Sequence, residues 1–261
     1  GAHYGRGEWD AAAALLRQLL EEAPEVARAW FLLGVVEGAR GRFSAASDAL
    51  RRALALAPDD SESRHLFAKA LARDGRATEA IAEYERLLSR APGIAVAQTE
   101  LGALLQGQGD IDTAIECHRA ALAADPQLVA ALNNFGAACR AAHRPGEALA
   151  ALERASALDP GRPEILLNLG NVLKDLGRLE EAALVYGRQT RTSSPLDAEL
   201  AAARGGVLAR LARQSEAISA LERAVRADPN NVGALGRLIR EREQGCDWST
   251  VDLLARQARD L

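Results

Sequence analysis

The chain has little of what membrane-spanning or nucleic-acid-binding proteins contain. It has no run of about 18 consecutive apolar residues, so we expect no segment to cross a membrane. Lysine occurs only twice among 261 residues, and the formal net charge is −4 with a pI near 5.7. A phosphate-binding surface needs a net basic face, so we expect no nucleic-acid partner.

Cysteine, methionine and aromatic residues are also scarce. Cys117, Cys139 and Cys246 are an odd number of cysteines without metal-ligand spacing, which fits a reducing compartment and predicts a cytoplasmic protein. Aromatic residues make up only 4% of the chain, and methionine is absent. The core must therefore consist mainly of alanine and leucine, which suits closely packed helices.

Proline, by contrast, recurs at a fixed interval. The interval is 34 residues, apart from one of 35, at Pro24, Pro58, Pro92, Pro126, Pro160, Pro195 and Pro229. A fixed period indicates one structural unit copied in tandem. Apolar residues within each unit are spaced by three and four, which is typical of helices, and no segment reads as a strand. The sequence therefore predicts an all-α repeat fold.

Small residues follow the same period. Glycine recurs early in four units, at Gly34, Gly102, Gly136 and Gly170. Alanine recurs later in six units, at Ala46, Ala80, Ala114, Ala148, Ala182 and Ala217. We interpret these as positions where the two helices of a unit approach closely.

Glycine also marks the predicted turn between the two helices of a unit. It stands there at Gly41, Gly75, Gly109 and Gly177. A helix often ends in a left-handed residue, a conformation that glycine adopts at little cost. His143 replaces the turn glycine in one unit, so we expect some backbone strain there.

These periods divide the chain into consecutive segments. Residues 1–26 are predicted to be the last part of one unit, entered near the end of its first helix. Full units are predicted at 27–60, 61–94, 95–128, 129–162, 163–197 and 198–231. A divergent final pair of helices is predicted at 232–261. Because the period is unbroken, we interpret the whole as one solenoid in which each unit touches only its neighbours.

The pattern resembles the tetratricopeptide repeat (TPR) family over essentially the whole chain. The period of 34 residues is that of the TPR helix–turn–helix unit. The resemblance implies a right-handed superhelical solenoid of about fourteen antiparallel helices, with the first helix of each unit lining a concave groove. It also implies a protein-interaction module that binds extended peptides or partner segments in that groove.

The candidates for catalytic or metal-binding residues have structural explanations. Gly107 and Gly109 lie on a predicted turn, without the preceding strand that a dinucleotide site needs. Asp110 and Asp112 open a predicted helix, where carboxylates cap free N–H groups. His118 takes a slot that holds tyrosine or leucine in other units, so we interpret it as a core residue. We therefore predict no catalytic residue, metal site or cofactor in this chain.

The predicted peptide-binding residues lie on outward positions of the first helices. Asn134 and Asn168 are one period apart, and Asn133 and Asn171 lie near them. An asparagine amide both donates and accepts hydrogen bonds, so a row of asparagines can clamp the backbone of an extended peptide. The alternative is that these are ordinary solvated positions.

Four cationic residues could add a preference for acidic peptides. They are Arg140, Lys174, Lys69 and Arg73, of which the first two are one period apart. Any asparagine row is short, because other units carry different residues at the slot of Asn134, namely Leu32, Leu66, Glu100, Ala203 and Arg237. The Lys/Asn/Arg set that clamps peptide C-termini in chaperone-binding TPR domains is not found.

The C-terminal residues resemble one particular group of TPR-containing proteins. Cys246-Asp247-Trp248-Ser249, followed by a predicted amphipathic helix, resembles the junction after the TPR array of protein O-GlcNAc transferases. The segments 132–136 and 167–171 resemble repeats of that family. The resemblance implies the substrate-recognition arm of a larger UDP-GlcNAc-dependent enzyme, whose catalytic region is not among these residues. Alternatively, Trp248 plugs the end of the hydrophobic core.

One unit departs from the pattern. The segment 163–197 has one extra residue, and its second helix is predicted to run through Gly187 to Ser194. Arg204 then stands where leucine is expected. We predict a local change of superhelical pitch near 187–206, with simple sequence drift as the alternative.

Three functions stay open at this point. The first is an interaction module with a peptide groove, and the second is such a module attached to a glycosyltransferase. Because the chain starts in mid-repeat, we expect it to be a piece of a longer protein. The third is a scaffold without an attached enzyme, or a structural adaptor that joins copies of itself into a homo-oligomer.

Overall fold

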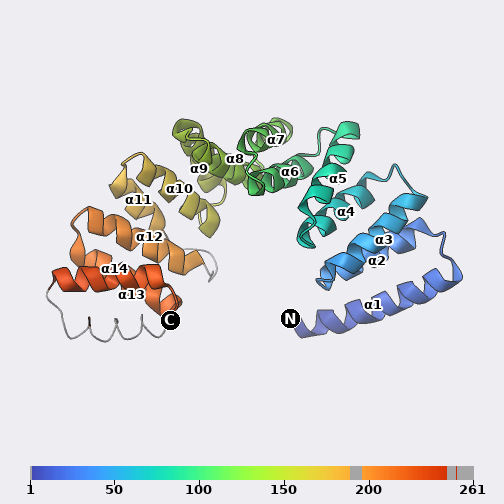
Figure 1. Ribbon diagram of the computed structural model, residues 1–261, viewed down its shortest axis with the longest axis horizontal. Coiled ribbons are helices and arrows are strands. Elements are labelled where there is room, and N and C mark those ends of the chain that lie inside the picture. The colour runs from blue at the N-terminus through green and yellow to red at the C-terminus, as the bar shows by residue number, and fades with distance from the viewer. Residues whose placement is uncertain (1, 189–195, 246–250, 252–261) are drawn as a thin grey trace. The chain divides into compact units, whose positions relative to one another are not determined.

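The computed structural model describes residues 2–188, 196–245 and 251, and within them it contains fourteen helices and no strand (Figure 1). The chain divides into two compact units, Gly1–Ala131 and Leu132–Leu261, and the division falls inside α8 (Val129–Ala141). Unit 1 contains α1 (Ala2–Glu22), α2 (Ala27–Ala39), α3 (Phe43–Leu56), α4 (Ser61–Arg73), α5 (Ala77–Arg90), α6 (Ala95–Gly107) and α7 (Ile111–Ala124). Unit 2 contains α9 (Pro145–Leu158), α10 (Pro163–Asp175), α11 (Leu179–Tyr186), α12 (Leu196–Arg210), α13 (Gln214–Ala227) and α14 (Val232–Gln244). The predicted all-α repeat fold is confirmed.

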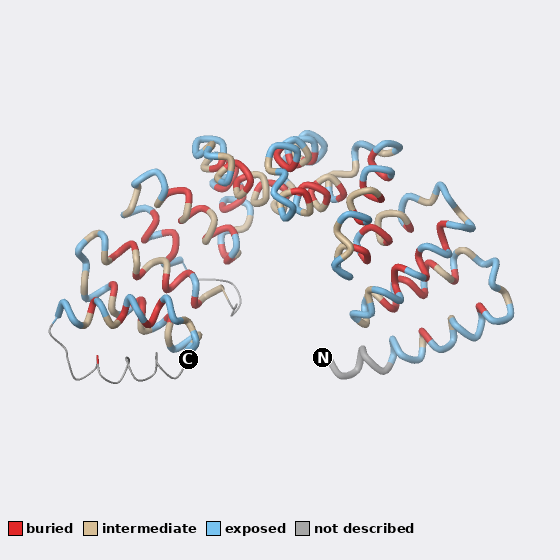
Figure 2. Tube along the Cα trace, in the orientation of Figure 1, coloured by how far each residue is buried: buried red, intermediate tan, exposed pale blue. Residues whose placement is uncertain are grey.

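In unit 1, helices that follow each other in the chain pack on each other. In unit 1, α2 packs on α3, α4 on α5 and α6 on α7, and each pair also contacts the next. The first helix of each of these pairs has 13 residues and the second has 14. Figure 2 shows the buried residues gathered on the sides where neighbouring helices face each other. Of the described helices, none is long and apolar enough to cross a membrane.

The turn between the two helices of a pair has a left-handed residue. The backbone φ is positive at all four predicted turn glycines and at two other residues, in the set Gly41, Gly75, Gly109, Gly177, His143 and Ala212. His143, with φ of 57°, confirms the substitution predicted from the sequence. Ala212, with φ of 56°, was missed because the extra residue before it shifts the register by one. Such a conformation costs a residue with a Cβ about 1–2 kcal/mol.

Close approach of paired helices depends on a small residue facing a large one. A Cβ added to the first-helix glycine would lie within 2.6 Å of a side chain sixteen residues later, in the pairs Gly34–Leu50, Gly102–His118, Gly136–Leu152, Gly170–Tyr186 and Gly205–Leu221. Ala68 occupies the same slot opposite Tyr84, and both are buried. The six periodic alanines are at most 1% exposed. The predicted role of the periodic small residues, close approach of the two helices of a unit, is therefore confirmed.

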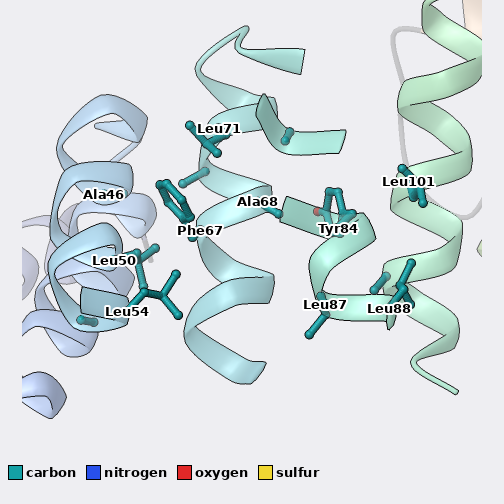
Figure 3. Close-up of a cluster of buried hydrophobic side chains, with 14 of the residues drawn as sticks. Ala46, Leu50, Leu54, Phe67, Ala68, Leu71, Tyr84, Leu87, Leu88 and Leu101 are labelled. Atoms are coloured by element: carbon teal, nitrogen blue, oxygen red, sulfur yellow. The ribbon is translucent and has the colours of Figure 1, made fainter. Parts of the chain in front are cut away.

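The hydrophobic core of unit 1 continues from one helix pair to the next. Figure 3 shows Leu50 and Leu54 of α3, Phe67 of α4 and Leu101 of α6 within one cluster of buried side chains. Tyr84 is 1% exposed and is the largest fully buried side chain of the cluster. The first helices of unit 1, α2, α4 and α6, therefore pack on a continuous hydrophobic core.

The first helix differs from the prediction. The sequence suggested the end of one helix and the start of another within residues 1–26, but α1 is continuous from Ala2 to Glu22. Gly5 and Gly7 do not interrupt it, because glycine costs only about 1 kcal/mol relative to alanine inside a helix. The alanine- and leucine-rich residues 11–20 that follow favour a single helix.

The irregular unit also differs. Its second helix, α11, ends at Tyr186 and does not run through Gly187 as predicted. Arg204 of α12 packs against Gly187, where an added Cβ would be 3.0 Å from the guanidinium carbon. Residues 190–194, on which the rest of this prediction falls, lie outside the described part of the chain. The same is true of the motif from Cys246 to Ser249.

Candidate functional site

A groove of about 660 Å³ runs along α12 in unit 2. We call it the α12 groove, and its lining includes residues from α10, α12 and α14. Its lining residues include Asn171, Lys174, Ala202, Ala203, Gly206, Arg210, Arg237 and Arg240. α12 packs on both α10 and α14, so these two helices form the sides of the groove.

The groove exists because small residues occupy the middle of the α12 face that lines it. Ala203 and Gly206 take the slots that hold Asn168 and Asn171 in α10, one unit earlier. A Cβ added to Gly206 would meet only the end of the Arg237 side chain, at 3.3 Å from Nη1. The core beneath is secured by Leu221, which packs against Gly205.

The sides of the groove carry more positive than negative charge. Four lining residues are cations, namely Lys174, Arg210, Arg237 and Arg240, while two are carboxylates, Glu199 and Glu241. Lys174 Nζ donates to the neutral Asn171 Oδ1 at 3.2 Å, and Arg237 Nη1 lies 3.4 Å from the Ala202 carbonyl oxygen. Within the described residues, none of the four cations forms an ion pair with a carboxylate.

The predicted asparagines lie together, but in a different arrangement from the one expected. Asn168 Nδ2 donates to Asn133 Oδ1 at 2.9 Å, and Asn133 Nδ2 donates to Asn134 Oδ1 at 3.3 Å. Asn133 therefore stands between the two asparagines that the period had paired. Asn171 Oδ1 accepts from the Tyr186 hydroxyl at 2.8 Å, and burial raises the pKa of that tyrosine. All four amides are half-buried.

Arg140 has a partner that the sequence analysis did not anticipate. Its Nε donates to Asp175 Oδ2 at 2.6 Å, across from α8 to the end of α10. Both side chains remain about 40% exposed, at 40% and 42%. They line a hollow of about 380 Å³ that also includes His143 and Val172. The charge of Arg140 is therefore partly neutralised, unlike that of Lys174.

In unit 1, the predicted cation Lys69 belongs to a cluster around Glu100. Glu100 Oε1 lies 3.2 Å from Lys69 Nζ, while its Oε2 lies 2.6 Å from His65 Nε2 and accepts from the Tyr84 hydroxyl at 2.9 Å. Burial acts to raise the pKa of Glu100, yet His65, Lys69 and Tyr84 together bring it below its ordinary value. Burial also raises the pKa of Tyr84.

Arg73, the other predicted cation of unit 1, lies over the ring of Phe43. Its guanidinium carbon is 5.9 Å from the ring centroid, within the range of a cation–π contact. Arg73, Phe43 and Lys69 line a hollow of about 330 Å³ next to α2 and α4. This hollow is a second, smaller candidate surface, and all of its lining residues belong to unit 1.

Asp110 and His118, which were not assigned to catalysis, have structural roles. Asp110 Oδ1 accepts from the Thr113 backbone N–H at 3.2 Å and caps α7. His118 is fully buried against Gly102, and burial lowers its pKa to about 4. Cys117 is half-buried and Cys139 is buried. Over the described ranges, no three histidine, cysteine or acidic residues are grouped so that they could hold a metal ion.

Sequence reasoning missed most of the α12 groove. It noted Ala203 and Arg237 only as residues that interrupt the asparagine row. The available signal was a run of small residues at 202, 203, 206 and 209, on a helix face where neighbouring units carry larger side chains. Arg237 and Arg240 follow one unit later with a spacing of three, which places them on one face of α14.

Several solved structures have a similar fold. A chain of the APC/C hetero-tetramer Cut9–Hcn1 matches with a TM-score of 0.71 and 21% identity, covering 90% of this chain and 46% of that one. The PilF protein of Pseudomonas aeruginosa matches with a TM-score of 0.66 and 19% identity, covering 81% of this chain and 96% of its own. YrrB, described as a TPR protein with an unusual peptide-binding site, has a TM-score of 0.60 and 22% identity, with 73% and 97% covered. This chain thus spans just under half the length of the Cut9–Hcn1 chain, and the similarity shows the fold alone.

Sequence comparison identifies the family. No curated protein matches this chain in sequence. Four family profiles described as tetratricopeptide repeat do match, over residues 2–61, 93–161, 198–231, and 39–105 together with 140–205. The last of these spans just over half of the chain. Together with the helix pairs and their turns, these matches show that the chain belongs to the tetratricopeptide repeat family.

Proposed function

We propose that this chain is a protein-interaction module that holds an extended segment of a partner protein in the α12 groove. The observation that carries this proposal is the small size of the α12 residues in the groove. Ala203 and Gly206 leave a space of about 660 Å³ between α10 and α14. That volume is within the range of typical ligand sites. Amide and guanidinium groups on both sides can donate hydrogen bonds to a peptide backbone.

The other predicted residues extend this proposal along the first helices. Asn171 lines the α12 groove directly, and Asn168 connects through Asn133 to Asn134. A bound segment would exchange these amide–amide hydrogen bonds for bonds to its own backbone. The peptide-binding site named for YrrB supports peptide binding as a function of this fold. Arg140 would contribute in unit 2, whereas Lys69 and Arg73 line a separate candidate surface within unit 1.

The test is to fill the groove. Ala203→Leu places on α12 the residue that Leu32 and Leu66 represent at the same slot, so the fold should accept it. Phage displaying random dodecapeptides would be selected on the wild-type chain alone, and the enriched peptides would then be tested for binding to this variant. Ala150→Leu, at an exposed position of α9 away from the groove, is the matched control.

We expect the enriched peptides to bind the wild-type chain and Ala150→Leu equally and to lose binding to Ala203→Leu. Circular dichroism at 222 nm should be unchanged in both variants. If the enriched peptides bind Ala203→Leu as well as they bind the wild type, the groove is not the binding site.

We further propose, from the sequence alone, that the module selects substrates for an O-GlcNAc-transferase-like enzyme. The proposal rests on the segments 132–136 and 167–171 and on the motif from Cys246 to Ser249. Its test is the reading frame after Leu261, followed by transfer of GlcNAc from UDP-GlcNAc to bound peptides by the encoded protein. A reading frame that stops soon after Leu261 would contradict it and favour a stand-alone scaffold or a self-assembling adaptor.

A further inference from the structure

The charges around the α12 groove indicate what kind of segment it takes. We propose that the groove binds acidic segments, through two or more glutamate or aspartate side chains of the partner. This inference rests on the function proposed above and adds the chemistry of the ligand to it. It depends on three observations, which are the position of the cations, their lack of carboxylate partners, and the position of the groove's own carboxylates.

The cations stand on both sides of the groove floor. Lys174 is in the last turn of α10, on one side, while Arg237 and Arg240 are on α14, on the other. Arg210 is in the last turn of α12 itself. A segment lying along α12 would therefore meet positive charge from both sides, although the chain as a whole has a net charge of −4.

These cations are available to a ligand, whereas other arginines of unit 2 are already paired. Arg144, Arg178 and Arg213 each bind the glutamate three residues later, at 2.6 to 2.7 Å. No described carboxylate forms such a pair with Lys174, Arg210, Arg237 or Arg240. An exposed guanidinium can take a carboxylate through two parallel hydrogen bonds without first breaking an ion pair.

The groove's own two carboxylates offset only part of the charge of its four cations. Glu241 is only 8% exposed, and Glu199 lies in the first turn of α12. Glu199 and Arg210 are eleven residues apart on one helix, which separates them by about 16 Å along its axis. Glu199 is therefore distant from the cation at the C-terminal end of α12, beyond Gly206, where the floor is open.

The test uses synthetic peptides and fluorescence anisotropy on the full chain. The acidic probe is a labelled nine-residue peptide in which glutamate alternates with serine and leucine, amidated at its C-terminus. Two counterparts carry glutamine or lysine in place of every glutamate. A fourth peptide repeats the glutamine sequence with a free C-terminal carboxylate, which separates side-chain recognition from recognition of a chain end.

Two double variants test the location. Arg237→Gln with Arg240→Gln removes two charges from the groove side of α14. Arg223→Gln with Arg226→Gln removes the same two charges, at the same spacing, from exposed positions of α13 outside the groove. We expect the first to weaken binding of the acidic probe by about five- to tenfold and the second by less than about twofold. Binding should also weaken as salt is raised from 0.05 to 0.3 M.

The contradicting results separate the two proposals. Equal binding of the glutamate and glutamine peptides, or binding of the free-carboxylate peptide alone, would overturn the acidic-segment inference and leave the groove proposal in place. Equal weakening by the two double variants would also overturn it, because the effect would then follow net charge. If peptides selected from the random library bind Ala203→Leu as tightly as the wild type, the groove proposal itself fails.

Discussion

At the scale of single residues, His118 shows how the repeat tolerates an unusual core residue. Its slot holds Leu50, Leu152 or Leu221 in other units, and Tyr84 or Tyr186 in two more. The hydroxyl groups of the two tyrosines donate hydrogen bonds, that of Tyr84 to Glu100 and that of Tyr186 to Asn171. Neither ring nitrogen of His118 makes a hydrogen bond within the described residues. A buried polar group without a partner costs about 1–3 kcal/mol.

His118 should therefore make stability depend on pH. Burial lowers the pKa of its imidazole to about 4, while the unfolded chain takes up the proton near pH 6.5. Stability should be at its full value above pH 6.5 and should fall as the pH drops toward 4, by up to about 3 kcal/mol. The measurement is urea unfolding of the wild type and His118→Leu at pH 7.5 and 5.0.

His118→Leu should be more stable than the wild type at both pH values, and the gain should be larger at pH 5.0. Paired carboxylates such as Glu79 and Glu181, whose pKa values are lowered by Arg76 and Arg178, also contribute to acid sensitivity. They contribute equally in both proteins, so the difference isolates His118. The same pH dependence in both proteins would contradict this account.

At the scale of elements, the close packing of paired helices depends on the glycine that faces a large side chain. A methyl group at Gly170 would overlap the ring of Tyr186, which is 3% exposed and cannot move away freely. We expect Gly170→Ala to lower the free energy of unfolding by about 1–3 kcal/mol. Gly236→Ala is the matched control, since a methyl group there meets nothing within 4 Å inside α14.

Gly236→Ala should be neutral or raise stability by up to about 1 kcal/mol, because alanine is the better helix former. Opposite signs for the two substitutions, measured by urea unfolding, would support close approach as the role of the periodic glycine. Equal effects would show that both glycines act only through helix propensity.

The elements also show which parts of the fold the sequence predicts. Helix pairs and their turns were predictable, because each depends on residues close in the chain, such as Gly41 or the alanine at Ala46. The ends of α1 and α11 were not predicted. Helix-forming residues follow Gly7 in α1, and Arg204 packs on Gly187 at the end of α11. The repeat pattern predicts neither feature.

At the scale of the whole molecule, the period predicts the fold but only part of the candidate site. Asn168 was paired by the period with Asn134, yet its side-chain amide donates a hydrogen bond to Asn133. The α12 groove was not predicted because it depends on small residues, Ala203 and Gly206, at positions where other units carry larger ones. The asparagine and cation patterns are defined by side chains that Ala203 and Gly206 lack.

The central claim is that unit 2 binds an acidic segment along α12. Titration of the 27.7 kDa chain with the acidic probe, followed by backbone amide NMR shifts, tests it most directly. We predict that the largest shifts are confined to α10, α12 and α14 and include Ala203, Gly206 and Arg237. Shifts centred on α9, α13 or unit 1, or no shifts at saturating peptide, would contradict the account.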